Sequence, residues 1–540
     1  SLDTLLERLG DESSLVQRYA LVGLVRAGAR FGPGNSLPMV SILKRAGESD
    51  LALRSTAIHA LASCATEEQV LALARHESAD VRVGAVVALR RQRRGSIAQL
   101  LADSDSRVVT EAARSIYDEQ ITEAMPVLAK LVERESLSGT ALVRRVLNAN
   151  FRLGTPESAA ALASFAARTD ADELLRWEAL DRLSKWTTPP GRDAVTGEWW
   201  PLDARDGAGL AALAEQLVGK DITKAPERIV RAWIELVETS DCRSVGATLL
   251  QLANDSAADK NVRAAAVRAA KKVAPVELEP ALAKLVKDPE SAVRAAALRA
   301  IAGVEPAKAF PLLEEAALHG SVEERRVAYS LFAQLEDVRV DALAASELRR
   351  HAAGLLPREV ALDLVELAEA RQDAAVAGSL ASLRSLREID AALAPFADSL
   401  YGGDKARGKE ILRGKAETEC LRCHKIEWGE GGQVGPDLVG VGQRLSRADL
   451  LASICDPNRR IADGYQGTIL FLESGRNVAG IVVREDRDTI VVRTPQDELV
   501  EVATSEVESR RPDLSAMPQD VSKHLSRREM RDLLEYLANL

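Results

Sequence analysis

The chain has 540 residues, of which 46% are hydrophobic, 28% charged and 4% aromatic, and its net charge is −10. This length exceeds what one hydrophobic core can fill, so several domains or a repeat array are expected. The negative charge disfavours a nucleic-acid binder, which needs a basic surface. No uncharged apolar stretch reaches the roughly 18 residues of a membrane span, so none is expected.

A short pattern recurs along much of the chain: an aliphatic residue, an arginine and an Ala-rich amphipathic run. The aliphatic place is taken by Leu53, Val81 and Val108, 28 and 27 residues apart, and by Val262, Val293 and Arg325, 31 and 32 apart. Each period has room for two helices of about 11–12 residues and two turns. The pattern resembles HEAT repeats, which implies an α-solenoid over residues 1–395. An irregular helical domain is the alternative.

The periodicity breaks at about residues 187–206, where prolines and glycines predict a loop. Trp199 and Trp200 stand next to each other in this loop. We expect them to hold the excursion against the side of the solenoid. The alternative is a partner-binding patch, because exposed aromatic side chains often mark one.

A second domain is expected over residues 396–540, and it contains the sequence Cys420-Leu-Arg-Cys423-His424. This CxxCH spacing is the attachment pattern of c-type haem. Two thiols on one helical turn can form thioethers with two vinyl groups of one porphyrin, and His424 then supplies an imidazole nitrogen to the iron. The pattern therefore predicts one covalently bound haem c.

Zinc is the alternative for the cysteine pair. A structural zinc ion takes four ligands, so two more would have to come from Cys455, His524 or an acidic residue. The sequence has no second Cys or His pair at metal-binding spacing, and we interpret Cys455 as a core residue. No P-loop, dinucleotide-binding or hydrolase motif is present either.

The pattern changes again between about residues 465 and 510, from helical spacing to alternating apolar and polar residues. Runs rich in β-branched residues begin at Thr468, Val478, Thr489 and Leu499, with turn residues between them. We therefore expect a small antiparallel insert of four or five strands inside a domain that is otherwise α-helical.

The order of motifs in the second domain resembles that of class I cytochromes c. A helix, the CxxCH motif, Gly-Pro-Asp-Leu at 435–438, Met-Pro at 517–518 and a last helix with Tyr536 follow one another. The resemblance implies that the first helix crosses the last one where Gly408 meets Tyr536. It also implies that Pro436 packs beside the haem-ligating histidine and helps to orient its ring.

The same resemblance implies that Met517, on a loop before the last helix, is the axial ligand opposite His424. Met530, His524 or an open position are the alternatives. Ligation by His and Met would raise the reduction potential relative to a harder second ligand.

Taken together, the HEAT-like repeats, the Trp-Trp-Pro-Leu loop at 199–202, the CxxCH domain, its Asp-Pro-Asn segment at 456–465 and its β insert resemble the haem-binding domain proteins of planctomycetes and verrucomicrobia. In many of these a β-propeller similar to sugar dehydrogenases precedes the repeats. The resemblance implies that this chain is the C-terminal part of a larger exported dehydrogenase-like protein. The sequence begins without a signal peptide, and haem attachment implies maturation in the periplasm or an equivalent compartment.

The expected function is that of a mono-haem c-type cytochrome that transfers electrons and has no substrate turnover of its own. The HEAT array would serve as a scaffold or docking surface. Expected partners are a redox protein or dehydrogenase module, and a protein ligand on the solenoid. The alternatives are an open-site haem enzyme and a protein-binding scaffold in which the haem senses redox state.

Overall fold

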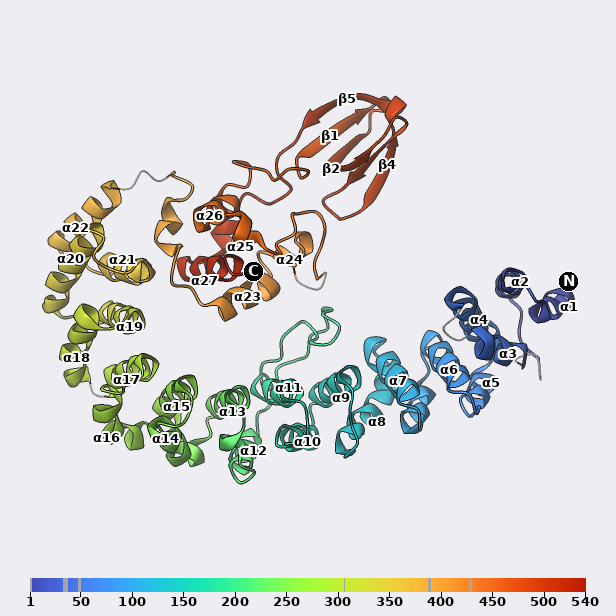
Figure 1. Ribbon diagram of the computed structural model, residues 1–540, viewed down its shortest axis with the longest axis horizontal. Coiled ribbons are helices and arrows are strands. Elements are labelled where there is room, and N and C mark those ends of the chain that lie inside the picture. The colour runs from blue at the N-terminus through green and yellow to red at the C-terminus, as the bar shows by residue number, and fades with distance from the viewer. Residues whose placement is uncertain (1, 33–36, 47–49, 305, 387–389, 427–429) are drawn as a thin grey trace. The chain divides into compact units, whose positions relative to one another are not determined.

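The computed structural model describes residues 2–32, 37–46, 50–304, 306–386, 390–426 and 430–540 (Figure 1). The fold is mainly helical and forms two compact units, Ser1–Lys287 and Asp288–Leu540. In the described part of the chain, no helix is both long enough and apolar enough to cross a membrane. The predicted domain border near residue 395 lies inside the second unit and stays a prediction.

The first unit consists of helical hairpins that stack on their neighbours. One row is formed by α2, α4, α6, α7, α9, α11, α13 and α15, each in contact with the next. The helices are α1 (Leu2–Glu7), α2 (Ser14–Arg26), α3 (Leu37–Ala46), α4 (Leu51–Cys64), α5 (Glu67–Leu73), α6 (Ala79–Arg91), α7 (Ser106–Asp118), α8 (Met125–Ala129), α9 (Thr140–Leu153), α10 (Pro156–Ala166), α11 (Glu173–Ser184), α12 (Leu210–Val218), α13 (Glu227–Thr239), α14 (Gly246–Asn254), α15 (Lys260–Val273) and α16 (Pro275–Leu285). The predicted repeat of helix pairs is confirmed.

The arginine of the recurring pattern has a structural role that explains its recurrence. Arg82 donates to the carbonyl oxygen of His76, 2.9 Å away, and to the Asp103 carboxylate at 2.7 Å. Arg294 likewise binds the carbonyl oxygens of the turn before its helix and the Glu324 carboxylate at 2.7 Å. The arginine therefore satisfies carbonyl groups in the turn between two helices and links its repeat to the next one.

The last copy of the pattern differs by one residue from the predicted register. Arg325, predicted in the aliphatic place, donates to the carbonyl oxygen of Gly320 at 2.9 Å, as the arginine of the pattern does. The aliphatic place belongs to Glu324, which is only 6% exposed. An acid can take this place because the guanidinium of Arg294 neutralises it. The corrected spacing is regular, since Glu324 lies 31 residues after Val293.

The excursion at residues 187–206 is fixed to the side of the first unit by Trp200. Its ring contacts Tyr117 edge-on with centroids 5.7 Å apart. The Arg152 guanidinium lies 3.1 Å from the ring centroid and also donates to the Trp200 carbonyl oxygen. Trp199, in contrast, is 69% exposed. One tryptophan therefore holds the excursion, as predicted, and the other is presented at the surface.

The second unit continues the helical hairpins and then forms a smaller helical core. Its helices are α17 (Ser291–Val304), α18 (Pro306–His319), α19 (Val322–Phe332), α20 (Val338–Ala352), α21 (Ala361–Glu369), α22 (Ala374–Ser385), α23 (Lys405–Gly414), α24 (Cys420–Cys423), α25 (Val441–Arg444), α26 (Arg447–Cys455) and α27 (Arg527–Leu537). Helix α27 begins with a capping box between Ser526 and Glu529, which satisfies two main-chain donors at its start. It lies at the centre of the core and packs against both α23 and α26.

Helices α23 and α27 cross at Gly408. A Cβ atom added to Gly408 would lie 2.0 Å from the carbonyl oxygen of Asp532 and 2.7 Å from Cβ of Tyr536. Only glycine permits this approach, because any other residue would push the two backbones apart. The contact between Gly408 and Tyr536 is the one that the resemblance implied.

Arginines of α27 bind acidic residues of α21 within the same unit. Arg531 donates to Asp363 at 2.8 Å, and both side chains are 6% exposed. The same Asp363 oxygen accepts from Arg326 of α19 at 2.9 Å. Arg527 and Arg528 add more exposed ion pairs with Glu369 and Glu366. The last hairpins of the repeat array are therefore joined to the core helix by both buried and exposed charge pairs.

A five-stranded antiparallel sheet of order β4-β3-β2-β1-β5 is inserted between α26 and α27. The strands are β1 (Gly467–Leu472), β2 (Asn477–Glu485), β3 (Thr489–Arg493), β4 (Leu499–Ala503) and β5 (Val507–Pro512). A separate apolar cluster stabilises the sheet, formed by Leu470, Leu472, Val478, Ile490, Val492 and Val502. The predicted antiparallel insert is confirmed.

Candidate functional site

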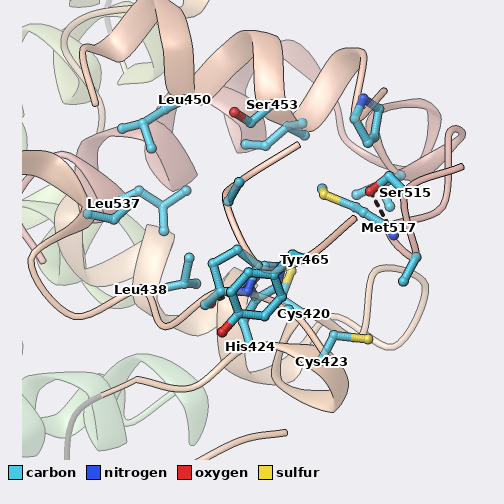
Figure 2. Close-up of a pocket in the computed structure, with 18 of the residues that line it drawn as sticks. Cys420, Cys423, His424, Leu438, Leu450, Ser453, Tyr465, Ser515, Met517 and Leu537 are labelled. Atoms are coloured by element: carbon cyan, nitrogen blue, oxygen red, sulfur yellow. Dashed lines mark hydrogen bonds between the residues drawn. The ribbon is translucent and has the colours of Figure 1, made fainter. Parts of the chain in front are cut away.

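A cavity of about 420 Å³ lies in the second unit, between the CxxCH segment and the loop before α27 (Figure 2). This volume is in the range of small-molecule and cofactor sites. All five predicted site residues, Cys420, Cys423, His424, Pro436 and Met517, line it. The apolar part of the wall is formed by Leu412, Val434, Leu438, Val441, Leu445, Leu450, Ile454, Ile461, Val521, Leu533 and Leu537.

The two cysteines lie on α24, a single helical turn. Glu419 starts this turn in the left-handed region, with φ of 41°. The next segment folds back against the turn, since the N–H of Gly432 donates to Leu421 O at 2.9 Å and the N–H of Gly435 donates to Cys423 O at 2.8 Å. Burial raises the pKa of both thiols. The sequence thus places two protonated, half-buried thiols at the edge of one cavity.

The ring of His424 is held in one tautomer. Its Nδ1 lies 2.8 Å from the carbonyl oxygen of Pro436, which can only accept a hydrogen bond. The proton of the neutral imidazole therefore lies on Nδ1, and Nε2 keeps its lone pair. The ring lies flat against the next segment because Gly435 has no side chain; a Cβ there would be 2.7 Å from Cε1 of the ring. Burial lowers the pKa of His424, which favours the neutral form that binds metals.

Met517 lines the cavity from the loop before α27, and Figure 2 shows it apart from the CxxCH residues. Its N–H donates to the Ser515 hydroxyl at 3.2 Å. The two alternative ligands lie elsewhere: Met530 is fully buried in the core of α27, and His524 has a side chain that is 43% exposed. Neither is among the residues of the cavity wall.

These residues are chemically compatible with a haem c. Two thiols on one turn can attach the group, and the imidazole of His424 and the thioether of Met517 are side chains that bind haem iron. A zinc site fits less well, because the described ranges contain no group of three His, Cys, Asp or Glu side chains able to bind a metal. Cys455 is buried in the core, and burial raises its pKa to about 11.

The segment after α26 contributes to the site, although no role was predicted for it. Pro457, Arg460, Ile461 and Tyr465 form part of the cavity wall, and Asn458 binds the loop that carries Met517. Residues 456–465 are one of the motifs that carry the family resemblance, and they begin with an Asp-Pro-Asn turn at the end of a capped helix. The turn predicts a change in chain direction but gives no indication of what the segment faces.

The buried imidazole predicts a pH dependence of stability for the chain expressed without haem. The pKa of His424 is lower in the folded chain than its ordinary value of about 6.5, so below that pH the unfolded chain binds a proton that the folded chain does not. This contribution to stability is complete above about pH 6.5 and is lost as the pH falls towards the folded-state pKa. Urea unfolding at about pH 7.5 and about pH 5.5 measures it.

The control for this prediction is His424→Gln, whose amide can also donate to Pro436 but does not titrate. The parent chain should lose more of its free energy of unfolding between the two pH values than the variant does. Equal losses would contradict a buried, neutral His424.

Comparisons with known proteins identify the repeats. Residues 246–332, which span α14 to α19, match the family of HEAT repeats. No curated protein matches the chain. Two engineered proteins of known crystal structure align with it: the first is 16% identical and covers 71% of this chain and 98% of its own, with a TM-score of 0.28. The second is 14% identical and covers 61% and 93%, with a TM-score of 0.11. The repeat assignment rests on the family match and the stacked hairpins.

Proposed function

We propose that residues 396–540 form a mono-haem c-type cytochrome that transfers electrons, and that the HEAT repeats serve as its scaffold or docking surface. The observation that carries this proposal is the cavity in which Cys420, Cys423 and His424 share one wall and Met517 lies on another. Met517 lines the same cavity as the other three side chains, although it lies 93 residues after His424 in the sequence.

Each residue has a distinct role in this proposal. A haem c bound here would supply one-electron iron chemistry. The thiols of Cys420 and Cys423 would attach the group covalently to the chain. His424 presents Nε2 because its Nδ1 proton is committed to the Pro436 carbonyl, a hydrogen bond that also makes the imidazole a stronger ligand.

Met517 and the cavity wall favour electron transfer over substrate turnover. Met517 would supply a thioether to the iron in addition to the imidazole of His424, and no position would then be open for a substrate. The apolar wall would keep water away from the bound group, which together with a thioether ligand would raise the reduction potential. Among the alternatives, an open-site haem enzyme would need a movable Met517.

Location and partners follow from the same chemistry. Thioether formation requires export, so we infer that the protein matures in the periplasm or another exported compartment. A redox protein or a dehydrogenase module is the proposed electron partner. The exposed Trp199 favours a protein-binding role for the repeats. It lies on the excursion that Trp200 holds in place, and tryptophan is common at binding hot spots.

A pyridine haemochrome spectrum tests the proposal. The chain would be expressed with export and c-type maturation machinery, next to a known cytochrome c as a positive control. We expect a c-type spectrum that stays with the polypeptide through acid–acetone extraction, and none from a variant with Cys420→Ala and Cys423→Ala. A chain without covalent haem, while the control cytochrome matures normally, would refute the proposal and leave the repeats as a protein-binding scaffold.

A further inference from the structure

The loop that carries Met517 begins at the end of the sheet. Directly after β5, the N–H of Asp513 donates to Gly467 O at 2.8 Å, and the Gln466 side-chain amide donates to Asp513 O at 2.7 Å. The strands are so close here that a Cβ on Gly467 would lie 2.5 Å from the carbonyl oxygen of Leu514. Two hydrogen bonds therefore fix the start of this loop to Gly467, the first residue of β1, and to Gln466, which precedes it.

A second connection reaches the loop from the cavity wall. The N–H of Ser515 donates to Oδ1 of Asn458 at 2.8 Å, and the Ser515 hydroxyl accepts from the N–H of Met517 at 3.2 Å. Asn458 lies in the turn after α26, next to the buried Pro457 of the cavity wall. Ser515 thus links Asn458 to Met517 through two hydrogen bonds.

Apart from the side chain of Met517, which packs against the helical core, this loop buries little apolar surface. Leu514 is 61% exposed, and Ala516 and Pro518 are also exposed. Hydrogen bonds from outside the loop therefore supply much of the order of its backbone. Asn458 and Gln466 provide two of them.

The sheet can hold the Met517 loop in place because it also contacts the opposite wall of the cavity, the wall that carries the CxxCH residues. Arg493, at the end of β3, pairs with Asp497 and donates to Oε1 of Gln433 at 3.3 Å. Gln433 belongs to the segment that folds back under the CxxCH turn. The sheet thus contacts the chain on both sides of the cavity, near His424 and near Met517.

We infer that Asn458 and Gln466 are positioning residues for Met517, and that the sheet sets the separation between the two predicted axial ligands. This inference rests on the proposed function. A thioether is a weak, neutral ligand on a flexible side chain, so its binding to iron depends on how closely the backbone holds it in place. Loss of either tether should free Met517 without affecting the attachment of haem to the cysteines.

Spectra of the haem-loaded full chain test the inference. The ferric Met–iron charge-transfer band reports Met517 directly, and carbon monoxide binding to the reduced protein reports an open distal position. Asn458→Ala removes the acceptor for the Ser515 N–H. It should weaken the band, lower the reduction potential and speed carbon monoxide binding roughly five- to tenfold, the effect expected from losing one hydrogen bond.

Gln466→Ala should change the same signals in the same direction. Asn458→Asp keeps an acceptor oxygen and should restore the parent spectrum, which a general loss of folding would not allow. The matched control is Arg510→Ala, which removes the exposed pair with Glu485 in the same sheet and should leave the band and the potential unchanged.

The possible outcomes distinguish a failure of the proposed function from a failure of the positioning role. Absence of covalent haem in the parent chain would refute the proposed function itself. Covalent haem with an unchanged band and unchanged carbon monoxide binding in both alanine variants would refute only the positioning role. A band missing from the parent while covalent haem is present would show that Met517 is not a ligand, and would refute the inference as well.

Discussion

Alanine at position 408 is expected to lower the free energy of unfolding of the second unit by about 2–3 kcal/mol. The added Cβ would lie 2.0 Å from the carbonyl oxygen of Asp532, a backbone atom that cannot rotate away as a side chain can. Helices α23 and α27 would have to separate. Leu412 on α23 and Leu533 on α27 line the cavity, so its walls would separate as well.

Gly414→Ala is the matched control for Gly408→Ala. Gly414 ends the same helix, and a Cβ there would meet no atom within 4 Å. Urea unfolding followed by circular dichroism should show a large loss for the first variant and almost none for the second. Similar effects of the two substitutions would show that α23 and α27 do not pack as closely as described.

The second large effect is expected at Asp363. Asp363→Ala should destabilise the second unit by about 3 kcal/mol, because it removes the nearest carboxylate of the buried Arg531 guanidinium and leaves only Asp532, 3.8 Å away. Arg326 also loses its partner, but it is more exposed and can be hydrated. Thermal and urea unfolding of the full chain measure the loss.

Two further variants test the cause of this loss. Glu369→Ala removes a more exposed pair with Arg527 and should cost at most about 1 kcal/mol. Replacing both partners of the closer pair, Asp363→Leu with Arg531→Met, should recover part of the stability, because the buried guanidinium is removed together with its carboxylate. Asp532, 3.8 Å from Arg531, loses that neighbour but keeps the N–H of Asp404 as a donor. A double variant as unstable as Asp363→Ala would contradict this explanation.

The parts of the site that were predictable from residue spacing alone are local in sequence, whereas Met517, 93 residues after His424, came from the resemblance to class I cytochromes c. The cysteine pair and His424 lie within five residues, and their spacing alone indicates the chemistry. The contact between Gly408 and Tyr536 came from the resemblance to class I cytochromes c. The four runs of alternating residues gave four of the five strands, because each has a buried face.

The parts that could not be predicted depend on long-range contacts. Strand β5 is charged and almost fully exposed, so it has no alternating pattern, and its pairing with β1 alone makes it a strand. Asn458 binds a residue 57 positions away, and Arg531 binds one 168 positions away. Nothing near either residue in the sequence indicates its partner.

The register of the repeats was missed at one copy for a different reason. Two adjacent arginines, Arg325 and Arg326, both fit the pattern, and a buried acid before them did not look like an aliphatic residue. The choice depends on Arg294 of the previous repeat, which neutralises Glu324. Pairing between repeats, and not the residue type alone, decides which positions can be buried.

The charge pairs between α21 and α27 also affect how such proteins can diversify by recombination. A gene fusion near residue 396 that joined residues 396–540 to a different repeat array would leave Arg531 facing residues not selected to neutralise it. Shuffling would succeed more often when the last hairpins, with Asp363, Glu366 and Glu369, are inherited together with α27. The segment that recombination would have to transfer as one piece therefore begins within the repeats, before the domain border near residue 395 that the sequence predicts.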